Sequence, residues 1–133
     1  MSQSRRLGDL QLLIMRVLWQ QGQATVAQVH RALRPARRLA LTTIATMLRK
    51  MEKKDLVTHH LDGRQFVYQP AVAERDVLRS MTGDLIQRLF DGDARALLNH
   101  LVTEGEIDAD ELAELQKMVA DRQRRGKEGG RSC

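Results

Sequence analysis

Cysteine and long apolar runs are nearly absent from this sequence. Its single cysteine is the last residue, Cys133, which excludes an internal disulfide and a cysteine-rich metal site. No run approaches the roughly 18 consecutive apolar residues of a membrane-spanning helix, and no apolar signal segment lies at the amino end. We therefore expect a cytoplasmic protein that does not enter a membrane.

Motifs for catalysis or metal binding are also missing. The sequence contains no Gly-rich phosphate loop, no Ser–His or Cys–His signature and no metal-ligand spacing. His59 and His60 are neighbours in a predicted strand, so they point to opposite faces and cannot readily chelate one ion. His30 and His100 are isolated. The sequence predicts no enzyme, no metal site and no cofactor.

Aromatic residues make up only 3% of the chain, whereas hydrophobic residues make up 42%. The core is therefore expected to be aliphatic, built from Leu, Val, Ile, Met and Ala. With 133 residues, the chain is long enough for one domain of ordinary size or two small ones.

The formal net charge of +5 is distributed unevenly along the chain. Residues 1–70 contain 12 Lys/Arg and 4 Asp/Glu, a balance of +8. Residues 71–120 contain 5 Lys/Arg and 11 Asp/Glu, a balance of −6. This division indicates a module that binds a polyanion beside a module with another role.

Two helices are predicted at the start of the basic half. Apolar residues spaced as a helical stripe favour a first helix from about Asp9 to Gln21, which Gly22 ends. Thr25 and Gln28 form a capping box at the start of the second helix. Pro35 stops that helix, because proline disfavours helical backbone in the residue before it.

A third helix is predicted to begin at about Thr42 and to end near Lys54. One face is apolar, since residues at steps of three and four are Ile44, Met47, Leu48 and Met51. The other face carries hydroxyls near its start and cations further along, which suits the groove and phosphates of a nucleic acid. These residues are Thr42, Thr43, Thr46, Arg49, Lys50 and Lys53.

A hairpin is predicted directly after the third helix. Leu56 to Leu61 has a loosely alternating pattern, and Asp62-Gly63 is a strong signal for a tight turn. Gln65 to Gln69 returns the chain, and Pro70 closes the strand. The order helix, helix, helix, hairpin is typical of a winged helix-turn-helix module.

In such a module the third helix enters the major groove by its amino-terminal turns. Thr42, Thr43 and Thr46 would then lie near base edges, with the helix cations near phosphates. Arg64 at the wing tip can reach an adjacent phosphate or the minor groove. Arg37 and Arg38 make the turn between the second and third helices basic and complete the predicted DNA contacts.

Three more helices with apolar stripes are predicted in the acidic half. Asp91-Gly92-Asp93 breaks the first of them, Ala94 to Thr103 forms a short second one, and Asp108 with Glu111 caps the last. Three helices of this length bury little core in isolation. We therefore expect them to pack against the same helices of a second chain. The alternative is that they fold back onto the winged module.

The predicted architecture is mainly α. Residues 1–71 form a winged helix-turn-helix DNA-binding domain with three helices and a two-stranded wing, and residues 72–120 form a three-helix dimerisation domain. Residues 121–133 are charged and glycine-rich, so we expect this tail to be disordered.

Several motifs together resemble the bacterial penicillinase repressor family, which includes the repressors of β-lactamase and methicillin-resistance operons. The likeness covers roughly residues 7–119 and rests on Met15 and Leu18-Trp19 in the first helix, Thr42-Thr43 opening the third, and Leu89-Phe90-Asp91-Gly92 before the fifth. The resemblance implies a transcriptional repressor that binds a palindromic operator as a winged-helix homodimer. It also implies an interface in the last three helices, at positions matching Leu85, Leu89, Leu97, Leu98, Leu101, Leu112 and Leu115.

The sequence departs from this family pattern at two places. In well-studied members a sensor protease cleaves an Asn-Phe bond in the fifth helix, whereas the matching bond here is His100-Leu101, with Asn99 one position early. This difference argues against the same sensor protease as a partner. The copper-responsive branch carries a Cys-x-Cys pair near its end, whereas this chain has Cys133 alone.

Two other functions compete with operator binding. A winged helix can serve as a protein-interaction adaptor without nucleic acid, but an adaptor does not need the positive charge of the third helix and wing. Binding of structured RNA would require aromatic platforms for bases, whereas Phe66 and Tyr68 are expected to form the core of the wing. The operator sequence, the regulated genes and the inducing signal do not follow from the sequence.

Overall fold

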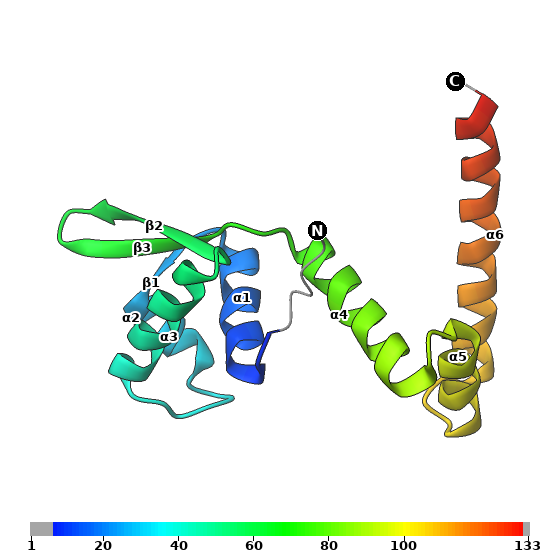
Figure 1. Ribbon diagram of the computed structural model, residues 1–133, viewed down its shortest axis with the longest axis horizontal. Helices are drawn as coiled ribbons and strands as arrows, with labels where there is room; N and C mark the ends of the chain where they lie inside the picture. Colours follow the sequence, from blue (N-terminus) through cyan, green and yellow to red (C-terminus); the bar gives the residue numbers. More distant parts are fainter. Residues whose placement is uncertain (1–6, 132–133) are drawn as a thin grey trace. The chain divides into compact units, whose positions relative to one another are not determined.

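The computed structural model describes residues 7–131, and side chains up to residue 126. Cys133, the single cysteine, lies outside the described residues. The described elements, in chain order, are α1 (Asp9–Gln21), β1 (Ala24–Thr25), α2 (Val26–Leu33), α3 (Leu41–Lys53), β2 (Val57–Asp62), β3 (Gln65–Pro70), α4 (Glu74–Phe90), α5 (Ala94–Thr103) and α6 (Ala109–Arg131) (Figure 1). No helix in this part of the chain is long and apolar enough to cross a membrane.

Helix α1 supplies the centre of the core in the amino-terminal part. Its stripe buries Ile14, Met15 and Leu18 completely, with 0% of each side chain exposed. The helix ends at Gly22, whose φ of 84° is favourable for glycine and whose N–H donates to the Leu18 carbonyl at 2.7 Å. The predicted bounds and end of the first helix are confirmed.

Helix α2 begins with the predicted capping box. The Thr25 hydroxyl accepts from the Gln28 N–H at 3.2 Å, and the Gln28 side-chain oxygen accepts from the Thr25 N–H at 2.8 Å. These two bonds satisfy backbone donors that have no partner inside the helix. The buried side of α2, which includes Val29 and Leu33, completes the core with α1 and α3.

The wing is the predicted hairpin, joined by a third strand that was not predicted. Strands β2 and β3 pair antiparallel as far as Asp62 and Gln65, so the loop consists of Gly63 and Arg64, and Gly63 has a φ of 66°. Strand β1 pairs with the other edge of β3, so the sheet order is β1-β3-β2. Two residues are too short to show an alternating pattern, so only the pairing reveals that Ala24 and Thr25 form a strand.

The prediction that Phe66 and Tyr68 both belong to a wing core is correct only for Tyr68. The Tyr68 side chain is 3% exposed, whereas Phe66 is 49% exposed. Phe66 pairs with Leu61, which is 63% exposed, two positions nearer the turn than the pair of Tyr68 and His59. The outer half of the hairpin therefore extends beyond the packed core.

The chain divides into two compact units inside α4, between Asp84 and Leu85, whereas the DNA-binding and dimerisation domains predicted from the sequence meet at residues 71 and 72. The start of α4 belongs to the first unit, because Val77 is fully buried in its core and Met81 packs against that core. The Trp19 side-chain N–H also donates to the Val72 carbonyl at 3.0 Å. No change of charge and no turn signal marks a boundary within this helix.

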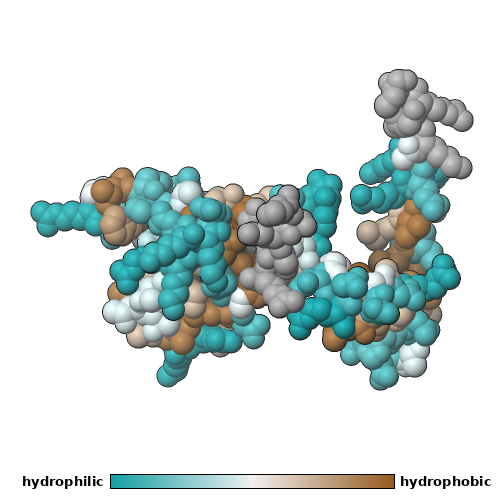
Figure 2. All heavy atoms as spheres, in the orientation of Figure 1, coloured by the Kyte–Doolittle hydropathy of each residue, from teal (hydrophilic) through white to brown (hydrophobic). Residues whose placement is uncertain are grey.

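The second unit contains the end of α4 together with α5 and α6. Asp93 caps α5 by accepting from the N–H groups of Arg95 and Ala96 at 3.0 and 3.2 Å. The predicted box of Asp108 and Glu111 precedes α6, with bonds of 2.8 and 3.2 Å. From Leu85 to residue 126 no side chain is buried. Figure 2 shows both hydrophobic and hydrophilic residues along α6.

Helix α6 continues to Arg131 and so extends into residues 121–133, for which the sequence predicts disorder. Apart from Gly126, residues 122–128 are Arg, Gln, Lys and Glu, which are among the better helix formers. The prediction relied on charge and glycine content, which do not exclude the continuation of a helix that has already begun. Residues 132 and 133 lie outside the described part.

Candidate nucleic-acid interface

Helix α3 has one buried and one exposed face. Ile44, Leu48 and Met51 are fully buried, which fixes the rotation of the helix on the core. All six residues predicted to contact DNA from this helix are exposed: Thr42, Thr43, Thr46, Arg49, Lys50 and Lys53. The structure therefore brings these six residues together on the solvent side of one helix.

The threonines at the start of α3 are not used as helix caps. The helix begins at Leu41, one residue before the predicted start, and its N-cap residue Ala40 makes no side-chain capping bond. Within the described part of the chain, the hydroxyls of Thr42 and Thr43 make no hydrogen bond. A threonine hydroxyl both donates and accepts, so it can pair with several base edges in a groove.

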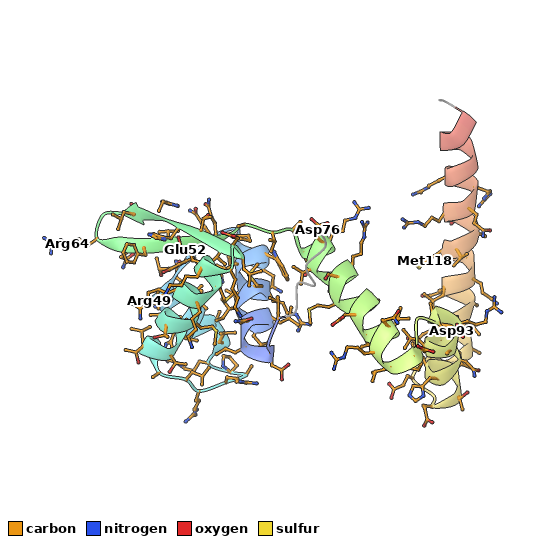
Figure 3. All side chains as sticks on the ribbon, viewed as in Figure 1. Arg49, Glu52, Arg64, Asp76, Asp93 and Met118 are labelled. Atoms are coloured by element: carbon orange, nitrogen blue, oxygen red, sulfur yellow. The ribbon has the colours of Figure 1, made fainter. Side chains whose placement is uncertain are left out.

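Cations follow the threonines along the same face. An Arg49 guanidinium nitrogen donates to the Thr46 hydroxyl at 3.3 Å, which links the hydroxyl and cation parts of the face. Lys50 and Lys53 lie in the last turn. In Figure 3 Arg64 extends from the tip of the wing, and its side chain is exposed.

The turn between α2 and α3 is held by His30, a histidine that is isolated in the sequence. The His30 side-chain nitrogen Nε2 lies 2.7 Å from the Leu39 carbonyl oxygen. A carbonyl only accepts, so Nε2 is the donor and fixes the end of the turn that leads into α3. Arg37 and Arg38 lie in this turn and are exposed.

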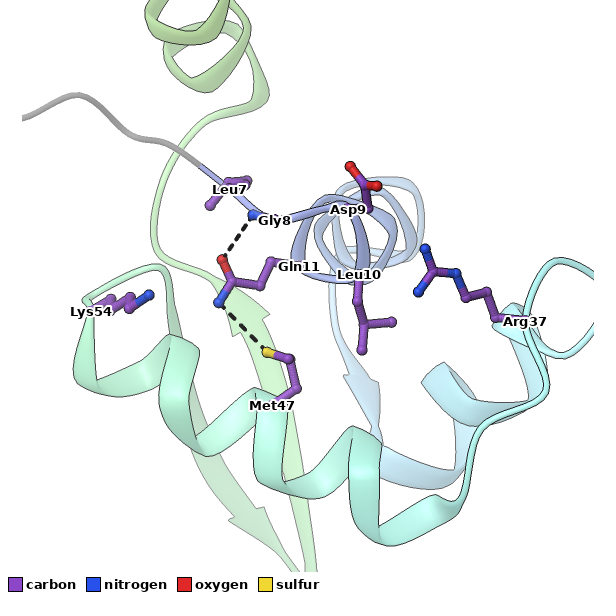
Figure 4. A pocket seen from close by; sticks show the side chains of 8 residues that line it. All are labelled: Leu7, Gly8, Asp9, Leu10, Gln11, Arg37, Met47 and Lys54. Carbon is purple, nitrogen blue, oxygen red and sulfur yellow. Dashed lines mark hydrogen bonds between the residues drawn. The ribbon is translucent and has the colours of Figure 1, made fainter.

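Arg37 of the α2–α3 turn also borders α1. It lines a hollow of about 680 Å³ that includes Gln11, Met47 and Lys54 (Figure 4). The Gln11 side chain is satisfied there, since its oxygen accepts from the Gly8 N–H at 3.3 Å and its nitrogen contacts the Met47 sulfur at 3.5 Å. We therefore assign this hollow no ligand.

The wing meets α3 through a pair of side chains that was not predicted. His59 Nδ1 lies 2.7 and 2.8 Å from the two carboxylate oxygens of Glu52. Tyr68 lies beneath this pair, and burial raises the pKa of its hydroxyl. The Glu52 carboxylate raises the Tyr68 pKa further, while the charge of Arg49 acts in the opposite direction. Pair formation between residues in a helix and a strand has no signature in sequence spacing.

The predicted interface leucines lie on helices whose apolar residues are incompletely covered. Leu85, Leu89, Leu98 and Leu115 are 42%, 68%, 43% and 37% exposed. Leu97, Leu101 and Leu112 are half-buried. Histidine and acidic residues do not gather into a metal site, because the described residues contain no group of three or more that could hold an ion.

Comparison with known proteins connects both parts of the chain to one family. A sequence model described as Penicillinase repressor matches residues 7–121. The transcriptional regulator BlaI of Mycobacterium tuberculosis is 35% identical over 123 residues, covering 91% of this chain and 88% of that protein. The penicillinase repressor of Bacillus licheniformis is 26% identical over 123 residues, with 92% and 96% covered.

A solved structure supports the assignment of the winged module. The solution structure of the DNA-binding domain of the repressor BlaI is 33% identical, with a TM-score of 0.50, over 57% of this chain and 93% of that domain. The RosR structure from H. salinarum has a TM-score of 0.53 at 19% identity over 92% of this chain, which shows likeness of fold alone.

Proposed function

Because this chain belongs to the penicillinase repressor family of transcriptional regulators, we propose that it represses transcription as a homodimer bound to a palindromic DNA operator. Members of this family are not enzymes. The observation that carries the proposal is the exposed face of α3, where three threonines precede three cations on a helix locked to the core by its other face.

The exposed residues of α3 have two different roles in the proposed DNA binding. The amino-terminal turns of α3 enter the groove, so their hydroxyls can pair with base edges, whereas the cations further along the helix lie near phosphates. Thr42, Thr43 and Thr46 would therefore select the operator, and Arg49, Lys50 and Lys53 would supply affinity and salt dependence. The likeness to the DNA-binding domain of BlaI supports this use of the helix.

The wing and the α2–α3 turn add cations beside this face. Arg64 is exposed at the end of a hairpin and is free to approach the duplex backbone. Arg38 lies in the turn held by His30 and Leu39. Arg37, on the hollow beside Met47, would act at longer range. Together with the balance of +8 over residues 1–70, these cations give the first unit the charge that a polyanion attracts.

The exposed leucines support a dimer. A unit in which no described side chain is buried cannot supply much folding energy from its own core. Packing of the same helices from a second chain would cover the apolar residues on both. A dimer related by a two-fold axis presents two α3 helices in opposite directions, so it reads an inverted repeat.

Cleavage by a sensor protease at His100-Leu101 is not part of this proposal. The bond differs from the Asn-Phe bond cleaved in well-studied relatives. The His100 ring also contacts the Phe90 ring, with centroids 5.9 Å apart. A substrate for the same protease would have to present a different residue on each side of the bond.

The test is selection of binding sites from random duplexes by the full chain, followed by titration of the recovered duplex and a scrambled duplex of equal composition. We expect recovery of an inverted repeat bound at least about 1,000-fold more tightly than the scrambled control, the lower end for specific DNA-binding proteins. Failure to bind any duplex in dilute buffer would favour the protein-interaction adaptor instead. Recovery of a single half-site bound by one chain would refute the dimer.

A further inference from the structure

We propose that Glu52 and His59 are positioning residues that hold the wing at a fixed angle to α3 and thereby determine where Arg64 meets the DNA. The inference rests on the proposed DNA binding and deepens it. It assigns to a carboxylate and an imidazole on the flank of the interface a role that neither the charge nor the periodicity of the sequence indicates.

The geometry of the pair is that of a strong hydrogen bond between two elements. His59 Nδ1 lies 2.7 Å from Glu52 Oε1 and 2.8 Å from Oε2. An ionised carboxylate only accepts, so Nδ1 carries the hydrogen and donates. This arrangement holds for both the neutral and the protonated ring. The two side chains are 33% and 34% exposed, which reduces competition from water.

The imidazole is also held by neighbours within the wing. His59 lies opposite Tyr68 in the strand register, and the centroids of their rings are 5.5 Å apart. The Phe66 ring meets His59 edge-on at 4.7 Å with an angle of 65° between the planes. Aromatic contacts at this distance favour a fixed ring orientation. His59 therefore joins a rigid part of the hairpin to α3.

Glu52 is poorly placed to serve any other role in DNA binding. It lies three residues beyond Arg49, beside the cationic face of α3 (Figure 3). A carboxylate this close to bound phosphates would repel them. Accepting a hydrogen bond from His59 directs the carboxylate to the wing and away from the exposed face. The contact therefore has a positional use that direct binding cannot explain.

The position of the pair along the hairpin lets it control the movement of the wing tip. Among the described residues, this is the side-chain hydrogen bond that joins α3 to the wing, and the hairpin beyond it is exposed at Leu61 and Phe66. A two-stranded hairpin without further packing is only marginally ordered by itself. Loss of the pair should therefore let the tip at Arg64 move without unfolding the core.

The experiment compares His59→Ala with His60→Ala in the full chain. His60 is the matched control, because it is an exposed histidine on the opposite face of the same strand. The probe is the duplex recovered by selection with the wild-type chain, titrated over a range of salt. We expect His59→Ala to weaken binding on the order of three- to tenfold, as for a partly lost charge-assisted contact, and His60→Ala to have no effect.

The salt dependence separates positioning from a general loss of stability. One lost phosphate contact lowers the slope of log affinity against log salt by about 0.9 per protomer. His59→Ala should lower the slope by at most this amount in the wild-type background, because the contact is only partly lost, and by nothing further in an Arg64→Ala background. An equal loss in both backgrounds would overturn the proposal, because His59 would then act independently of Arg64.

Glu52→Gln and nuclear relaxation of the free protein provide independent evidence. Glu52→Gln keeps the size of the side chain, so it should fold normally while weakening the bond to His59. In His59→Ala and in Glu52→Gln, the backbone order parameters of Gly63 and Arg64 should fall, while those of α3 stay constant. Unchanged order parameters would refute the positioning role. If the wild-type chain bound no duplex, the DNA-binding proposal would fail. These order parameters would still show whether the bond between Glu52 and His59 holds the wing at a fixed angle to α3.

Discussion

Replacement of Leu89 by alanine is the most direct test of the dimer. Complete burial of a leucine side chain contributes about 1.5–3 kcal/mol. Leu89 is 68% exposed in the single chain, so covering it would contribute about 1–2 kcal/mol per protomer at the same coefficient. A two-fold interface contains the residue twice, so Leu89→Ala should destabilise the dimer by about 2–4 kcal/mol.

This loss corresponds to a dimer dissociation constant that is roughly 30- to 700-fold higher, since each 1.4 kcal/mol is a factor of ten. Sedimentation equilibrium of the full chain without DNA, from nanomolar to high micromolar concentration, measures this constant directly. The melting of the winged module, followed separately, should change little because Leu89 lies in the second unit.

Leu61→Ala is the matched control. Leu61 is 63% exposed, so its truncation removes a similar apolar surface from the wing rather than from the proposed interface. The dissociation constant should equal that of the wild type. If Leu61→Ala weakened association as much as Leu89→Ala, or if the wild-type chain were monomeric throughout, our assignment of the interface would be wrong.

Three further predictions concern the winged module. Thr46→Ala should weaken binding of the selected duplex by roughly 5- to 150-fold and hardly change binding of the scrambled duplex. Lys53→Ala should weaken binding of both duplexes equally and lower the slope of log affinity against log salt by about 0.9 per protomer. The reverse pattern in titrations would contradict the proposed orientation of α3 on the DNA. Thr25→Ala should lower the free energy of unfolding by about 1 kcal/mol in urea, and a value near zero would show that the capping box is dispensable. The pKa of Tyr68 is raised in the folded chain, so its stabilising contribution is complete below pH 10 and is lost as pH rises through the folded pKa; a Tyr68→Phe variant should lack this part of the decline in thermal melts.

Features that depend on neighbouring residues could be predicted from the sequence. The capping box of Thr25 and Gln28 formed as expected, and so did the hairpin, with its loop at Gly63-Arg64. The exposed face of α3 was also predicted, because the positions that pack and the positions that face water alternate with the period of the helix. Most of the candidate interface follows from this one periodicity.

Features that depend on distant residues could not be predicted in this way. Strand β1 exists because β3 offers it an edge, and Tyr68 and Phe66 differ in burial because only the former lies over the core. The bond from Glu52 to His59 likewise requires the hairpin to fold back beside the helix. None of these contacts leaves a local pattern in the chain.

The sequence by itself determined the winged order of elements and the rotation of α3, because these follow from local spacing and residue type, and its motifs together carried the resemblance to the penicillinase repressor family. Only the tertiary structure decided that the first compact unit extends into α4, that α6 continues to Arg131, and that the wing is joined to α3 at His59. The boundary and the junction depend on which surfaces meet. The length of α6 depends on helix propagation, which charge and glycine content did not reveal.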